Sequence, residues 1–308
     1  MPGRRKIAPN RSRTWMHARV LPPRAFLLCI FTLAVLHLEC QIDHGLSPIR
    51  SKVGGTVIVK GDRVPPGSDQ VRVAVAKDFP PKNIKELLFS DMLPFKRTDS
   101  TLVTHPVSWE IYLPPGRYAV AAVLWKENNA PWNISDVIGV YGGAFLGDLL
   151  LPLYRSIDIP TADTVVDTLC IEANINRVNR DAKIEGAVSF RGPWPANTGA
   201  VGIGAFTGVP QPGNVLDYYF KNTALDYGIP VHAAAWNYRL RVRSGEAIRY
   251  VAVVWINAAY DLTSMKDIGF YPDPSDPSKP GALIMEKNGL QTGVDILVDF
   301  TTMDMASF

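Results

Sequence analysis

Few of the residue patterns that mark enzymes or metal proteins occur in this sequence of 308 residues. It has three cysteines without the spacing of a zinc site, and the three histidines beyond residue 39 (His44, His105 and His232) lie far apart. It contains neither an H-E-x-x-H motif nor a G-x-S-x-G nucleophile elbow. We therefore predict that the protein holds no metal or cofactor and is not an enzyme.

Three enzyme-like or ligand-like patterns are weak. A hydrolase is the least favoured interpretation. Catalytic residues can be scattered in sequence, so the missing motifs do not exclude one, and its candidates are Asp136, His105, Asp267 and His232. The spacing and terminal Glu of an EF-hand are absent around Asp261, Asp267, Asp273 and Asp276. The glycine-rich segment Gly202–Gly208 is followed by "VPQPG" and not by a helix, so we interpret it as a strand with a close neighbour.

A strong charge imbalance is missing from most of the chain. The formal net charge is +3, but residues 1–39 hold seven of the 32 Lys and Arg and one of the 29 Asp and Glu. The other residues carry 25 basic and 28 acidic side chains and are weakly acidic. Because the basic excess is confined to the N-terminus, we predict no nucleic-acid partner.

The sequence has no hydrophobic run long enough to span a membrane. The uncharged run Ala25–Leu36 has twelve residues, whereas a spanning helix needs roughly 20 and a signal-peptide core roughly 7–15. Arg19 and Arg24 precede this run and supply the positive region of a signal peptide. We interpret residues 1–39 as that signal peptide, with Met16 as an alternative start, and predict an exported protein.

The run is followed by Cys40, which resembles the acylated first residue of a bacterial lipoprotein. The resemblance implies cleavage before Cys40, a diacylglycerol on its sulfur with palmitate-type chains, and residues 40–51 as a lipidated tether. His37 and Glu39 depart from the Leu and the small residue that lipoproteins prefer there. Two alternatives are an ordinary cleavage site beside an incidental cysteine, and a disulfide between Cys40 and Cys170, a residue otherwise expected to be a small buried hydrophobe.

Beyond the tether the chain repeats itself at an offset of about 130 residues. Six segments recur in the same order, and each pair shares its pattern of glycines, aromatic residues and aliphatic residues. The pairs are "GTVIVKG" and "GAVSFRG", "VRVAVAKDFPP" and "VGIGAFTGVPQP", "PFKRT" and "YFKNT", "VSWEIYLPPGRYAVAAVLW" and "AAWNYRLRVRSGEAIRYVAVVW", "DVIGVY" and "KDIGFY", and "VDTLCIE" and "VDILVDF". Such an ordered series predicts a duplicated domain.

Each copy has the pattern of short strands. Apolar residues alternate along Val71–Val75, and turns rich in Gly and Pro separate such runs, which is typical of antiparallel β-sandwiches. The hairpin "LPPGRYAVAAV" and its surroundings resemble transthyretin-like (prealbumin-like, carboxypeptidase-regulatory-like) modules, as found in tandem in bacterial lipoproteins. We therefore predict an all-β protein with two tandem antiparallel sandwiches, in residues 52–178 and 179–302, and a tail in residues 303–308.

The tryptophans divide into two groups. Trp109, Trp125, Trp236 and Trp255 occupy matched places in the repeats, so we expect them in the two cores. Trp132 and Trp194 lie in turn-rich segments, and with Tyr271 they are the candidate ligand-binding residues. These tryptophans could equally fold back and close the end of a sandwich.

The resulting functional expectation is modest. We expect a non-enzymatic lipoprotein, membrane-anchored in the bacterial cell envelope (periplasmic or cell surface), which acts as a binding or spacer module. The sequence names no partner beyond the membrane reached through the lipid, and leaves an envelope protein or a glycan open. The first alternative is a carbohydrate-binding accessory protein that uses its loop aromatics, and the second is an envelope hydrolase.

Overall fold

The structure, a computed structural model, describes residues 50–61, 68–93, 106–127 and 130–304. The predicted signal peptide, Cys40, His44, His105 and the segment "PFKRT" lie outside these residues. Within the described part, no helix is long and apolar enough to cross a membrane.

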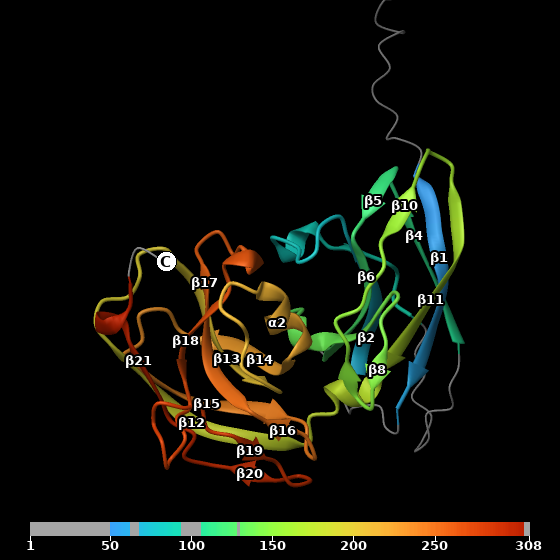
Figure 1. Cartoon of the computed structure of the whole chain (residues 1–308). Helices are drawn as coiled ribbons and strands as arrows, with labels where there is room; N and C mark the ends of the chain where they lie inside the picture. Colours follow the sequence, from blue (N-terminus) through green and yellow to red (C-terminus); the bar gives the residue numbers. More distant parts are fainter. Residues whose placement is uncertain (1–49, 62–67, 94–105, 128–129, 305–308) are drawn as a thin grey trace, which may run out of the picture. The chain divides into compact units, whose positions relative to one another are not determined.

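The first sandwich contains two main sheets (Figure 1). One sheet has the order β11–β1–β4, and the other has the order β3–β2–β6–β7. The strands of this half are β1 (Ser51–Lys60), β2 (Ser68–Ala76), β3 (Leu88–Phe89), β4 (Pro106–Leu113), β5 (Gly116–Tyr118), β6 (Val120–Glu127), β7 (Val137–Val140), β8 (Phe145–Leu146), β9 (Leu149–Leu150), β10 (Ile157–Ile159) and β11 (Val165–Asn174). Its 3₁₀ turns are η1 (Ile84–Glu86), η2 (Ile134–Asp136) and η3 (Ile175–Val178).

The second sandwich repeats this arrangement. Its sheets have the orders β21–β12–β15, with β20 beside β12, and β14–β13–β17–β18. Its strands are β12 (Ala182–Arg191), β13 (Thr198–Phe206), β14 (Asn222–Ile229), β15 (Ala235–Val242), β16 (Ala247–Ile248), β17 (Tyr250–Asn257), β18 (Lys266–Phe270), β19 (Leu283–Ile284), β20 (Leu290–Gln291) and β21 (Ile296–Asp299). It also contains the helix α2 (Val215–Phe220) and the 3₁₀ turns η4 (Leu262–Ser264) and η5 (Phe300–Thr302).

Each sandwich has its own hydrophobic core. The valines of β1 and β2 that alternate in the sequence meet between the sheets of the first sandwich, where Val53, Val57, Val73 and Val75 are fully buried. In the second core, Ile184 and Val188 of β12 face residues of β13 and β17. The prediction of an all-β fold built from two tandem sandwiches is confirmed.

One strand pairing differs from the prediction. β1 pairs with β4 in the antiparallel sense but with β11 in the parallel sense, and β12 pairs in the same way with β15 and β21. Turn signals fix the pairing of strands joined by a short hairpin, which must be antiparallel. β1 and β11 are separated by almost the whole sandwich, so no local signal determines their direction.

The predicted hairpin turn and glycine-rich strand are both present. Pro114 and Pro115 separate β4 from β5, and the Tyr118 hydroxyl donates a hydrogen bond of 2.9 Å to the Pro114 carbonyl across the turn. The segment Gly202–Gly208 begins inside β13, as expected. A Cβ on Gly202 would lie 2.4 Å from the Asp226 carbonyl oxygen, so this strand needs glycine to approach β14 closely.

The sheet that contains β2 and β6 is buried on both faces, and so is the corresponding sheet with β13 and β17. Every residue of β17 except Asn257 is buried, although alternation had predicted half-buried strands. The outer faces of these sheets pack against α2 and against each other's loops, and both sandwiches lie within one compact unit, Ile49–Phe308. By contrast, β4 and β15 keep the expected alternation.

Two expectations about single residues are wrong. Trp236 is 40% exposed, because the counterpart of Trp109, which lies opposite Gly55, is Tyr238, which lies opposite Gly186. Cys170 lies on β11 as expected, but its side chain points to the outer face of the sheet and is exposed. Trp236 lies two residues before Tyr238, on the same face of β15 but near the exposed start of the strand. Cys170 is exposed because Leu169 and Ile171 on either side of it occupy the buried face.

Candidate functional site: the cleft at the sandwich junction

The two sandwiches meet through a layer of aromatic and aliphatic side chains. Tyr219 and Phe220 at the end of α2 are buried against Val120, Val140 and Leu150 of the first sandwich. Phe79, which follows β2, adds edge-to-face ring contacts with Tyr219 at 5.5 Å and with Phe220 at 6.1 Å between centroids. Successive helical residues point about 100° apart, so the Tyr218 side chain points back to the sheet of β13 and β17 in the second sandwich.

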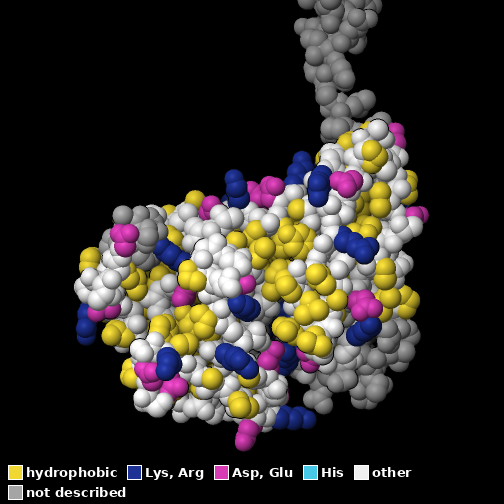
Figure 2. All heavy atoms as spheres, in the orientation of Figure 1, with side chains coloured by type: hydrophobic (Ala, Val, Ile, Leu, Met, Phe, Trp, Pro, Cys, Tyr) yellow, Lys and Arg dark blue, Asp and Glu magenta, His cyan; other side chains and the backbone are white. Residues whose placement is uncertain are grey.

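The hairpin of β8 and β9 forms one margin of this layer. Leu150 is buried in the contact, whereas Leu146 and Leu153 are exposed. Figure 2 shows hydrophobic side chains gathered on this face of the molecule. The hairpin therefore contributes buried Leu150 and partly buried Phe145 to the junction and leaves Leu146 at the surface.

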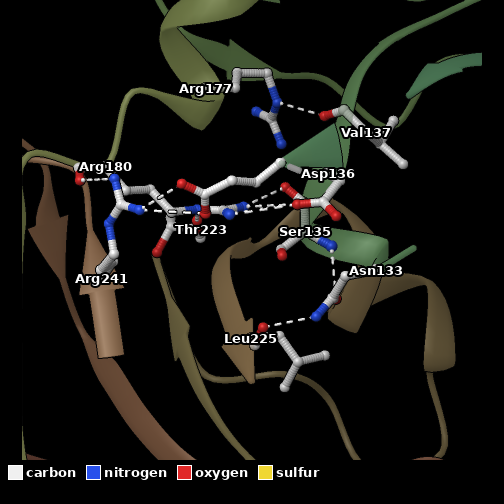
Figure 3. Close-up of polar contacts among 10 residues, drawn as sticks. Asn133, Ser135, Asp136, Val137, Arg177, Arg180, Thr223, Leu225 and Arg241 are labelled. Atoms are coloured by element: carbon white, nitrogen blue, oxygen red, sulfur yellow. Dashed lines mark hydrogen bonds and ion pairs between the residues drawn. The ribbon is translucent and has the colours of Figure 1, made fainter. Parts of the chain in front are cut away.

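A buried ion pair lies beside the aromatic layer (Figure 3). Arg180, in the connection between the sandwiches, donates to the Asp136 carboxylate from Nη1 at 3.3 Å. It also donates from Nη2 to the Ser135 carbonyl at 2.7 Å and from Nε to the Thr223 carbonyl at 3.3 Å. One guanidinium thus joins η2 of the first sandwich to the start of β14 in the second.

Further polar contacts cross the same junction. The Asn133 side-chain amide donates to the Leu225 carbonyl at 2.6 Å, and the Leu262 backbone N–H donates to the Lys82 carbonyl at 2.7 Å. At the solvent-exposed margin, Arg241 Nη1 lies 3.0 Å from the nearer carboxylate oxygen of Glu127. These bonds tie the loop between β6 and β7 to β14, and the loop between β17 and β18 to the segment after β2.

Burial sets the protonation of the ion pair. It raises the pKa of Asp136 from 3.8 to about 6, and the positive charge of Arg180 opposes this rise. Burial lowers the pKa of Arg180, an effect that Asp136 opposes in turn. Asp136 is therefore ionised and paired above about pH 6, where it holds Arg180 in place and is not available as a free acid or base.

A cleft of about 610 Å³ opens at this junction. Its first side is formed by the loop that contains η2, including Trp132, and its second side by β14 and the loop that contains η4, including Tyr260. Glu127, Asp226 and Ser135 contribute polar groups, and Arg180 also borders the space. We call this space the junction cleft. Its volume lies in the range of sites that bind small molecules.

Of the three predicted binding residues, Trp132 alone lines the junction cleft. Its ring stacks on Phe89 with centroids 5.1 Å apart and planes inclined by 22°, and the Lys126 ammonium lies 5.5 Å from the ring centroid. Trp132 is half-buried, so it belongs to the wall of a cleft and does not close the end of a sandwich.

Trp194 and Tyr271 lie elsewhere in the second sandwich. Trp194 precedes β13 and packs against Phe190 and Phe300, with centroids 4.5 and 5.2 Å away. Tyr271 follows β18 at the other end of the same sheet, where its N–H donates to the Val251 carbonyl at 2.8 Å. Both rings are partly buried against the second core. The structure therefore does not bring the three residues together.

The hydrolase candidates do not converge in the described residues. Asp136 is paired with Arg180, whereas the Asp267 carboxylate accepts hydrogen bonds from the hydroxyls of Tyr218 and Tyr250. His232 is exposed in the turn before β15, where its ring meets Trp194. His105 lies outside the described residues. No group of three His, Cys, Asp or Glu side chains within the described ranges is placed to hold a metal ion.

Two features of the junction cleft were not predicted from the sequence. Tyr260 had a readable signal: "YDLTS" repeats the order of "WNIS", an aromatic residue, then Asn or Asp, then an aliphatic residue and Ser or Thr. Arg180 had none, because the polar connection "NINRVNRDAK" has the composition of an exposed linker. In the structure Arg177 of this connection is also buried and donates to the Val137 and Asp148 carbonyls, both at 3.1 Å.

Comparison with known proteins gives distant structural likenesses. No family model and no curated protein matches the chain. A leucine-rich repeat protein from Bacteroides thetaiotaomicron aligns with 81% of the chain and 27% of its own length, at 8% identity and a TM-score of 0.28. The chain thus spans about a quarter of that protein.

Two other solved structures align with this chain over larger shares of their own lengths. A candidate adhesin from Bacteroides ovatus aligns with 72% of the chain and 84% of its own length, at 12% identity and a TM-score of 0.21. A candidate polysaccharide-binding protein from Bacteroides thetaiotaomicron aligns with 67% and 77%, at 11% identity and a TM-score of 0.20.

Proposed function

We propose that this chain is an exported, non-enzymatic binding protein of the bacterial cell envelope, tethered through a lipid on Cys40 and carrying its ligand site in the junction cleft. The observation that carries the binding role is the cleft itself. It takes residues from both sandwiches, and hydrogen bonds across the junction hold its margins together. Binding sites formed by loops on a rigid β scaffold are common.

The proposal assigns a role to each part of the sequence. Residues 1–39 direct export, residues 40–51 tether the protein, and residues 52–178 and 179–302 are transthyretin-like modules. The position of Cys40, directly after a hydrophobic run of signal-peptide length, supports the anchor. A multiply acylated residue holds a protein on a membrane more firmly than a single acyl chain does.

A pure spacer is the second candidate function, and the compact junction argues against it. A spacer needs reach but no internal cavity, whereas this chain leaves a ligand-sized cleft beside a well-packed contact. An envelope hydrolase is not supported by the arrangement of Asp136, Asp267 and His232, because each is held in a separate set of contacts.

The anchor is tested by the intact mass of the mature protein extracted from its native membrane. We expect a mass equal to residues 40–308 plus a lipid adduct. A Cys40→Ala variant should lose the adduct, and a Cys170→Ala variant, which alters the exposed cysteine of β11, should keep it. An unmodified wild-type chain that begins elsewhere would contradict the tether and make the protein freely secreted.

A further inference from the structure

We propose that the junction cleft binds a neutral oligosaccharide between two aromatic side chains, Trp132 and Tyr260, which the duplicated loops supply. This inference rests on the proposed binding function and names its ligand class. It replaces Trp194 and Tyr271, which pack against the second core, with a residue from the same cleft as Trp132.

Trp132 and Tyr260 occupy equivalent positions in the two sandwiches. Each directly precedes a residue that begins a 3₁₀ turn: Asn133 accepts a hydrogen bond from the Ser135 N–H, and Asp261 accepts one from the Thr263 N–H. Each loop leads from the third strand of a four-stranded sheet to the edge strand. The duplication therefore places two matched aromatic side chains beside one cleft.

The two rings leave space between them. They make no ring contact with each other in the described part of the chain, and Trp132 is instead supported by Phe89. Tyr260 is 56% exposed, and its hydroxyl has no hydrogen-bond partner among the described residues. Flat, partly exposed aromatic faces are suited to the C–H faces of sugar rings, since they bury apolar area while the polar edges stay accessible.

The backbone at Tyr260 is held in an uncommon conformation. Its φ is 53°, in the left-handed region that bulky residues rarely adopt. The Tyr260 N–H donates to the Asn257 carbonyl at 2.9 Å, and the next N–H, of Asp261, donates to the Asn257 side chain at 3.0 Å. Conformations of this kind persist where the surroundings fix them and are concentrated at binding sites.

The polar groups of the cleft match hydroxyl-rich ligands. The Asp226 carboxylate is exposed and has no hydrogen-bond partner within the described residues. The Ser135 hydroxyl is buried and also lacks a partner there, and an orphaned buried group calls for an explanation such as a ligand or an ordered water. Asp226 can accept hydrogen bonds from sugar hydroxyls, and Ser135 can donate or accept.

Charge disfavours acidic sugars. Asp226 and Glu127 both border the cleft, and the nearby arginines are already engaged, Arg180 by Asp136 and Arg241 by Glu127. A carboxylated saccharide would therefore meet like charge from both acidic side chains, offset in part by the Lys126 ammonium, which lies 5.5 Å from the Trp132 ring centroid. A neutral oligosaccharide avoids this repulsion.

The test is calorimetric titration of the mature chain carrying Cys40→Ala, so that no lipid is present. The probes are cellohexaose and the hexamer of N-acetylglucosamine as neutral ligands, hexagalacturonate as the anionic one, and decaproline as an aromatic-binding peptide. We expect at least one neutral hexamer to bind with a Kd below about 1 mM. Trp132→Ala and Tyr260→Ala should each weaken it about tenfold, and Asp226→Asn should weaken it severalfold.

Matched variants outside the cleft are the controls. Trp236→Ala removes an exposed tryptophan of β15, and Trp194→Phe changes a ring that packs on the second core and does not line the cleft; neither should alter the affinity. Because Tyr260 is exposed, the Tyr260→Ala variant should fold. It therefore keeps the test valid even if the Trp132→Ala variant fails to fold.

Four results would overturn the inference. They are no binding of either neutral hexamer, binding that is unchanged in Trp132→Ala and Tyr260→Ala, tighter binding of hexagalacturonate, and cleft-dependent binding of decaproline alone. None of these bears on the lipid anchor, which the mass of the Cys40 variants tests separately. An acylated protein without sugar binding would thus refute the ligand class and leave the tether intact.

Discussion

The ion pair between Arg180 and Asp136 gives the sharpest test of how the two sandwiches are held together. In an Arg180→Met variant, the apolar stem is kept and the guanidinium is lost. The Asp136 carboxylate then remains buried without its cation, and the Ser135 and Thr223 carbonyls lose their donor. Breaking a buried pair from one side is more costly than removing an exposed one.

The magnitude can be worked from the pKa. A cation in contact lowers the pKa of a carboxyl by about 1–3 pH units, and each unit corresponds to 1.36 kcal/mol, so losing Arg180 costs about 1.4–4 kcal/mol through Asp136. The two carbonyls add about 1 kcal/mol each. We therefore expect the free energy of unfolding to fall by about 3–6 kcal/mol at pH 8.

The pH dependence has a definite sign. The pKa of Asp136 is raised on folding, from 3.8 to about 6. Its favourable contribution to the free energy of unfolding is therefore fully present below pH 3.8 and is lost as the pH rises through 6. Without Arg180 the folded pKa rises further, and the loss continues to higher pH. At pH 5 Asp136 is largely protonated in both folded proteins, so the difference between them should shrink to about 2 kcal/mol, the share of the two carbonyls.

The assay is urea unfolding followed by tryptophan fluorescence at pH 5 and pH 8. Arg239→Met is the matched control, because Arg239 pairs with Glu185 at the surface and its side chain is 64% exposed. That change should cost less than about 1 kcal/mol at either pH. Equal losses in the two variants at pH 8, or an equal loss for Arg180→Met at both pH values, would refute the reasoning.

Three further predictions concern packing and exposure. Phe220→Ala should lower the free energy of unfolding by about 3–5 kcal/mol in urea titrations, since its ring is buried at the junction, whereas Ile284→Ala, at an 81% exposed site, should change it by less than about 0.5 kcal/mol. Gly186→Ala should destabilise by about 1–3 kcal/mol or more in thermal melts, because its Cβ would lie 2.0 Å from the Val294 carbonyl oxygen; an unchanged melting temperature would contradict this close approach. Cys170 should react with a thiol reagent in the folded protein without denaturant, and protection until unfolding would show that it is not on the outer face of β11.

Local patterns were sufficient to predict the strands but not all of their partners. Alternation along Val71–Val75 and the Pro-Pro-Gly turn after Leu113 predicted two strands and a hairpin, because both signals act between near neighbours in sequence. The parallel pairing of β1 with β11 depends on residues more than a hundred positions apart. Likewise, both faces of β17 are buried because the outer face packs against α2. The alternation of apolar and polar residues along one strand does not predict this second contact.

The candidate site was predictable in part for a similar reason. Trp132 was recognisable as an aromatic residue in a turn, and comparing the two repeats would have added Tyr260 at the equivalent place. Arg180 was not recognisable, because a charged residue in a short polar segment is usually solvated. Its burial follows from the position of Asp136, which lies on the first sandwich more than forty residues earlier in the chain.

The junction cleft follows from a difference between the two copies. Where the first copy has the three-residue turn η1, the second has the longer helix α2. Tyr218 of α2 is held by Asp267, whose counterpart in the first copy is Val137, and this contact lets Tyr219 and Phe220 project toward the first sandwich. The shorter turn in the first copy leaves Val120 and Val140 open to receive them. Two identical modules would present the same element to each other, whereas this asymmetry gives one module a projecting helix and the other a receiving sheet, and it sets the loops of Trp132 and Tyr260 beside a common space.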